Sequence, residues 1–212
     1  MRDPNTIRFL TSNYPLLQGL RLIPVGIVTL VLTAWANTDR TASQDGAFLL
    51  WCYLIAIGGY FLTGRYYQHT YGAVRATRRR LALYLGIVAI ASGLAMLTFW
   101  LDERYEGPVS FFGLFFAFGL MADYLCLTWP VRGRYLWIHP VFAGVVLVLS
   151  LLPLLGASGW WTLLGMHNAA PAILLLISLF MLIDGWYTHR LLTRLLGPAI
   201  LPASENGMRK LS

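Results

Sequence analysis

Charged side chains are scarce in this sequence. Only 12% of the 212 residues are Asp, Glu, Lys or Arg, whereas 58% are hydrophobic. Soluble domains are about a quarter charged, so this composition argues against an ordinary water-soluble protein and indicates a chain embedded in a lipid bilayer. The net charge of +7 does not indicate nucleic-acid binding, because the basic residues follow the pattern that membrane topology imposes.

The sequence also lacks the short motifs of common enzyme and metal sites. It contains no GxSxG, HExxH or phosphate-binding loop, and its four histidines do not have the spacing of metal or haem ligands. Cys52 and Cys126 lie in separate apolar segments, without a CxxC motif, and are expected to be buried thiols. The sequence therefore predicts no catalytic residue, no metal and no cofactor, and it favours a protein that is not an enzyme.

Long apolar segments are abundant instead. A bilayer core of about 30 Å requires about 20 residues of α-helix, and six segments are long enough or nearly so. They predict an all-α membrane protein with a single polytopic domain over residues 1–197 and a short cytoplasmic tail over residues 198–212. The six expected spans are approximately 20–36, 47–62, 81–101, 111–129, 137–155 and 170–186.

The basic residues decide the orientation of these spans. Fourteen of the sixteen Lys and Arg residues fall on one side when the six spans alternate in direction, while the loop over residues 102–106 is net acidic. Lys and Arg near span ends stay in the cytoplasm, so both termini are predicted to be cytoplasmic. All eight tryptophans lie near an expected membrane–water interface, where tryptophan accumulates.

The loop after the second span holds the densest basic cluster. We expect its arginines to bind a partner protein or anionic lipid, although the same charges are sufficient to set topology alone. The cluster consists of Arg75, Arg78, Arg79 and Arg80.

Two aspartates lie inside expected spans, Asp123 in the fourth and Asp184 in the sixth, both in the cytoplasmic half. A charged residue at the centre of a span costs about 2.5–3.5 kcal/mol and usually faces the protein interior. Arg21 enters the first span from the same side, so an ion pair with either aspartate is one hypothesis, and the aspartates then only stabilise helix ends. The alternative is a ligand or proton-coupling site, for which the candidates are Asp123, Asp184, Arg21, His139, Tyr124 and His189.

Small residues predict where helices approach one another, because helices in lipid associate by close packing. Gly113 and Ala117, followed by Gly119, mark one such contact on the fourth span. A longer stripe on the third span is expected to face a neighbouring helix, with a subunit interface as the alternative. The stripe consists of Ala82, Gly86, Ala89 and Gly93.

These features favour a multi-pass subunit of a transport system that acts with a protein partner or as a homo-oligomer. Short loops and the preference for arginine indicate a bacterial plasma (inner) membrane. One alternative is a non-catalytic accessory or scaffold subunit of a larger membrane complex. A second alternative is a membrane enzyme that acts on a lipid at the inner leaflet, with Asp123 and Asp184 as its candidates. The expected partners are the lipid bilayer and a protein, not nucleic acid.

Overall fold

The computed structural model describes residues 14, 17–37, 45–71, 78–105, 109–128, 136–157, 159–166 and 168–196. Every regular element in these ranges is helical, and each α-helix covers one expected span, so the predicted all-α architecture with six helices is confirmed. The α-helices are α2 (Leu22–Ala36), α3 (Asp45–Tyr71), α4 (Arg78–Arg104), α5 (Phe111–Thr128), α6 (Ile138–Leu151) and α7 (Ala169–Leu196). The short 3-10 helices are η1 (Gly19–Arg21), η4 (Leu152–Leu155) and η5 (Trp160–Leu164).

Two helical stretches are long and apolar enough to cross a membrane, Ile138–Leu155 and Ala169–Leu196. The core helices of soluble proteins can have the same length and composition. The structure therefore supports a helical protein with two candidate membrane-spanning helices, and the six-span topology stays a prediction.

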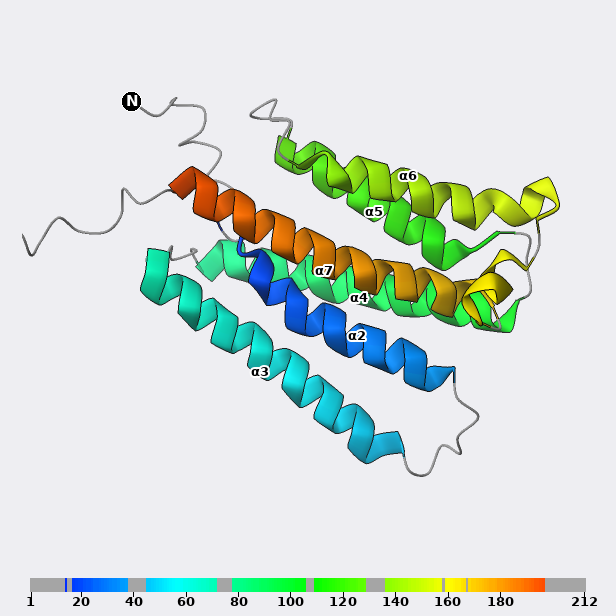
Figure 1. Ribbon diagram of the computed structural model, residues 1–212, viewed down its shortest axis with the longest axis horizontal. Helices are drawn as coiled ribbons and strands as arrows, with labels where there is room; N and C mark the ends of the chain where they lie inside the picture. The colour runs from blue at the N-terminus through cyan, green and yellow to red at the C-terminus, as the bar shows by residue number, and fades with distance from the viewer. Residues whose placement is uncertain are drawn as a thin grey trace, which may run out of the picture.

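The helices lie side by side around α7, which occupies the centre of the bundle (Figure 1). The most extensive contact joins α7 to α2, and α3 packs on α2. The pair formed by α5 and α6 lies on the other side of α7 (Figure 1). The C-terminal ends of α3 and α7 lie at the same end of the bundle, near the first residues of α2 and α6 (Figure 1).

Three helices are longer than the predicted spans, and α4 extends beyond both of its predicted ends. Helix α3 continues to Tyr71 and α7 to Leu196. Their last turns hold His69 and Arg194, and cations near a helix C-terminus interact favourably with the helix dipole. Apolar length predicts how much of a helix fits a bilayer, not where the helix ends, so these polar turns were missed.

Close backbone contact joins α7 to the start of the chain. A Cβ at Gly185 would lie 2.7 Å from the carbonyl oxygen of Gly19, and a Cβ at Gly19 would clash with Thr188 and with the backbone of Gly185. Further along, a Cβ at Gly26 would lie 3.2 Å from the carbonyl oxygen of Ser178. Only residues without large side chains allow η1 and α2 to approach α7 this closely.

The small-residue stripe on α4 does not pack as predicted. Its four members are exposed, and a Cβ at Gly86 or Gly93 would meet no atom within 4 Å. The expectation that this stripe faces a neighbouring helix of the same chain is wrong, because small-residue spacing shows a smooth face without showing what covers it. The contact predicted on α5 is confirmed at Gly113 and Ala117, since both residues are buried and a Cβ at Gly113 would clash with Ser150. It is wrong at Gly119, which is exposed and where a Cβ would meet no atom within 4 Å.

The start of α5 is capped by a residue that the sequence analysis assigned only to an acidic loop. Oδ1 of Asp102 accepts a hydrogen bond from the backbone N–H of Phe111 at 2.7 Å, and Oδ2 accepts one from that of Phe112 at 3.1 Å. The Ser110 hydroxyl oxygen accepts a third from the N–H of Gly113 at 3.1 Å. These oxygens bind N–H groups that have no partner within the helix. The end of α4 is thereby tied to the start of α5.

Candidate functional site

The buried polar pair of the bundle joins α6 to α7. The Nε2–H of His139 donates a hydrogen bond to Oδ1 of Asp184 at 3.0 Å, and both side chains are buried. His139 lies in the first turn of α6, and Asp184 lies in the middle of α7. A buried carboxylate is stable only when it is paired and hydrogen-bonded, so this contact fixes the relative position of the two helices.

A second carboxylate, from α5, faces the other nitrogen of the same imidazole. Oδ2 of Asp123 lies 3.8 Å from Nδ1 of His139, and the Asp123 side chain is 48% exposed. This distance fits an ion pair but is too long for a hydrogen bond. Nδ1 is buried without a hydrogen-bond partner. We call these three residues the Asp–His–Asp cluster.

Aromatic rings hold the imidazole in place. The ring of Phe180 packs edge-on against His139 with a centroid separation of 5.5 Å, and Phe142 stacks on Phe180 at 4.3 Å. One turn after Asp184, the hydroxyl of Thr188 donates to the Asp184 carbonyl oxygen at 2.6 Å. The imidazole therefore lies against one aromatic ring and between the two carboxylates.

This arrangement has one open position for a proton. With the Nε2 proton donated to Asp184, the lone pair of Nδ1 points to a partner that does not yet reach it. A proton added at Nδ1 produces an imidazolium between two carboxylates, of which Asp123 is the exposed member and Asp184 the buried one.

Arg21 does not form the hypothesised ion pair with either aspartate. Its guanidinium lies over the ring of Tyr60 on α3, 5.2 Å from the centroid, and its Nε is buried without a hydrogen-bond partner. Arg21 is the last residue of η1, directly before α2, and faces α3, whereas Asp184 faces α6. The sequence placed these residues at similar depth, but depth alone does not show which sides of two helices meet.

His189 belongs to a separate cluster near the C-terminal end of α7. The Tyr67 hydroxyl lies 2.9 Å from Nδ1 of His189 and accepts the backbone N–H of Leu20 at 3.2 Å. Burial raises the pKa of the Tyr67 hydroxyl to about 12, so it stays protonated and donates to His189. Tyr67 is fully buried together with Leu17 and Leu192. His189 therefore joins α3, η1 and α7, away from the Asp–His–Asp cluster.

The other residues predicted to form a site are Tyr124 and the four arginines of the basic cluster, and the structure describes the side chain of Tyr124 alone among them. Tyr124 follows Asp123 on α5 and is half-buried. Arg78, Arg79 and Arg80 form the first turn of α4. The side chains of these three arginines and all of Arg75 lie outside the part of the chain that the structure describes.

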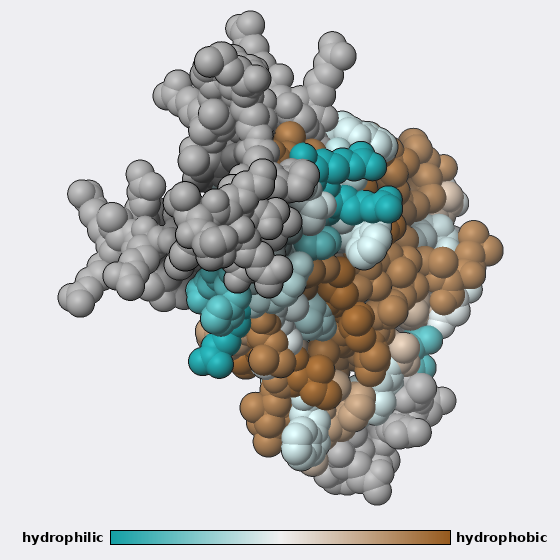
Figure 2. Space-filling model, turned by 60° about the vertical axis from the view of Figure 1, so that its left-hand side comes forward, coloured by the Kyte–Doolittle hydropathy of each residue, from teal (hydrophilic) through white to brown (hydrophobic). Residues whose placement is uncertain are grey.

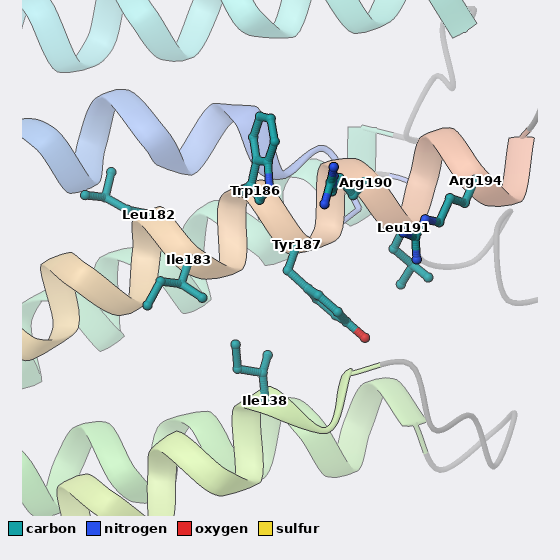
Figure 3. Close-up of a pocket in the computed structure, with 8 residues that line it drawn as sticks. All are labelled: Ile138, Leu182, Ile183, Trp186, Tyr187, Arg190, Leu191 and Arg194. Atoms are coloured by element: carbon teal, nitrogen blue, oxygen red, sulfur yellow. The ribbon is translucent and has the colours of Figure 1, made fainter.

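A groove of about 510 Å³ runs along α7 beside the start of α6. The sequence analysis missed it, although the spacing of Ile183, Tyr187, Arg190 and Arg194 along one helix face was available as a signal. Figure 3 shows Tyr187 extending from α7 towards α6, with Ile138 opposite it.

Neither the arrangement of potential metal ligands among the described residues nor comparison with known proteins points to another site. Within the described ranges, no group of three or more His, Cys, Asp or Glu side chains is arranged to hold a metal ion. Comparison with protein-family models, curated proteins and solved structures found no match to this chain.

Proposed function

We propose that this chain is a six-span integral membrane protein and a subunit of a proton-coupled transport system. The observation that carries the proposal is the Asp–His–Asp cluster, in which a buried histidine lies between carboxylates from two other helices. Ionisable groups buried among membrane helices commonly serve proton relays and substrate paths.

The surface of α3 and α4 supports the membrane part of the proposal. The largest exposed apolar patch of a soluble monomer usually covers about 300–600 Å² and is often functional. Figure 2 shows apolar residues over much of the coloured surface of one face, beside a smaller hydrophilic area. Apolar residues exposed by a third or more occur along both helices. They include Leu50, Trp51, Leu54, Ile55, Phe61 and Leu62 on α3, and Ile87, Ile90, Leu94, Met96 and Leu97 on α4.

The ends of the bundle support the predicted orientation. Arg65, Arg190 and Arg194 lie towards the C-terminal ends of α3 and α7, which share one end of the bundle (Figure 1). Asp102 caps α5 at the opposite end. This distribution agrees with the excess of basic residues expected on the cytoplasmic side.

The geometry suggests a route for the proton. Asp123 receives a proton from the exposed side of α5, and Nδ1 of His139 takes it over once the 3.8 Å separation closes. The hydrogen bond between Nε2 and Asp184 stabilises the imidazolium that results. Transfer of the Nε2 proton to Asp184 then returns the imidazole to its neutral form. Closing the 3.8 Å separation requires Asp123 to move towards His139, so on this proposal proton transfer depends on the relative position of α5 and α6.

A second candidate function is that of an accessory or scaffold subunit. It is favoured by the exposed small-residue stripe on α4, which presents a smooth face for another membrane helix. The lipid-enzyme alternative stays a hypothesis, and no arrangement of the described residues adds to it.

Proton flux tests the proposal. The tagged chain is purified in mild detergent from its native membranes together with the proteins that accompany it. The preparation is then reconstituted into vesicles that contain a pH-sensitive dye. Under an imposed membrane potential, we expect proton entry well above that of protein-free vesicles. A rate equal to that of protein-free vesicles contradicts proton coupling and leaves the scaffold function.

A further inference from the structure

The groove along α7 combines an apolar floor with a basic end. Leu182, Ile183 and Ile138 supply apolar surface, whereas Arg190 and Arg194 lie towards the C-terminal end of α7. Both arginines are exposed. Among the described residues, no Asp or Glu lines this groove, so its described lining carries positive charge alone.

Arg190 and Arg194 lie where they could bind the headgroup of a ligand at the membrane surface. The guanidinium of Arg190 lies over the Trp186 ring, 5.4 Å from its centroid. Tyr187 extends across the groove towards α6, between the apolar part and the arginines (Figure 3). Tryptophan and tyrosine favour the headgroup level of a bilayer, and arginine binds phosphate through a planar, multidentate donor group. The volume of about 510 Å³ lies within the range of ligand sites.

We propose that this groove binds one anionic phospholipid. The headgroup phosphate lies between Arg190 and Arg194, and an acyl chain follows Ile183 and Leu182 on α7 opposite Ile138 on α6. Charge complementarity selects this occupant, because a zwitterionic lipid offers the same acyl chain but adds a cation beside two arginines. The site requires a lipid surface and does not depend on proton transport.

Native mass spectrometry of the full-length chain in non-ionic detergent tests the proposal. Dioleoyl phosphatidylglycerol and dioleoyl phosphatidylcholine are added separately, and inorganic phosphate is added as a competitor. We expect one retained phosphatidylglycerol per chain, at least tenfold weaker binding of phosphatidylcholine, and no displacement by millimolar phosphate. The double variant R190Q/R194Q is expected to weaken phosphatidylglycerol binding about 30-fold, from the usual contribution of two basic residues near a membrane surface.

The matched control is R65Q/R104Q, which removes the same charge elsewhere. Arg65 and Arg104 are exposed, and Arg104 stacks over Trp100 at 5.4 Å as Arg190 does over Trp186. This control is expected to retain full affinity. Ile183→Gln changes an exposed side chain of the groove and is expected to weaken binding without loss of folding.

Three results would overturn the proposal. One is equal weakening by both double variants, which shows only a general charge effect. Another is equal affinity for the two lipids. The third is displacement by phosphate together with unchanged affinity of Ile183→Gln, which indicates a site for free phosphate and not for a lipid.

Discussion

Proton flux through vesicles that contain the His139→Gln variant is expected to fall about 100-fold. That is the lower end of the effect of removing a group that transfers protons. Glutamine retains an N–H donor for Asp184 but has no nitrogen that takes up a proton. The helix contact at this position is therefore preserved while the proton-binding step is lost. The flux assay described above, run with equal amounts of reconstituted protein, measures the effect.

His189→Gln is the matched control for this variant. His189, like His139, has a hydrogen-bonded partner, in this case Tyr67. It is half-buried, whereas His139 is buried, and it lies outside the Asp–His–Asp cluster. We expect flux within about twofold of the unmodified chain. If His139→Gln conducts normally, or if both variants lose flux equally, the cluster has no specific role in proton movement.

The largest effect on stability is expected from Gly185→Leu. Even a Cβ at this position would lie 2.7 Å from the Gly19 carbonyl oxygen and 2.9 Å from Cγ1 of Ile23. Backbone atoms cannot move aside as flexible side chains do, so α7 must separate from η1 and α2. We expect a loss of about 3 kcal/mol in the free energy of unfolding, the upper end of the usual cost of overpacking. Equilibrium unfolding in mixed micelles measures it.

Gly119→Leu, on α5, controls for the change of residue type. A Cβ at Gly119 would meet no atom within 4 Å, and leucine is a better helix former than glycine. We expect stability within about 0.5 kcal/mol of the unmodified chain or slightly above it. Equal losses in the two variants would show that the contact between Gly185 and Gly19 does not hold α7 against the start of the chain.

Hydropathy predicted the number and the places of the six helices. It could do so because each apolar run here is close to the length of one helix. It missed the polar last turns of α3 and α7, in which Tyr67 and Leu192 are buried by packing between helices. Small-residue spacing predicted the contact at Gly113 but also a contact on α4 that does not form. Packing partners depend on helix rotation, which the sequence of one chain does not determine.

The candidate site was predicted in part. Asp123 and Asp184 were predicted because an ionisable residue in a membrane span is energetically costly and is usually functional. His139 was added because it lies at a similar depth in the membrane to the two aspartates. The structure brings these three residues together, while Arg21 lies over Tyr60 and His189 pairs with Tyr67. The depth of a residue in the membrane can be predicted by counting residues along its helix. The neighbouring helix that its side chain faces is known only from the three-dimensional arrangement.

Labelling of single cysteines tests the six-span topology most directly. Cys52 and Cys126 are first replaced by serine, and His69→Cys or Tyr105→Cys is then introduced at the exposed ends of α3 and α4. With a membrane-impermeant maleimide added to intact cells, we expect labelling at position 105 immediately and at position 69 only after the membrane is opened. Labelling of both positions from the same side would mean that α4 does not cross the membrane, and it would contradict the six-span account.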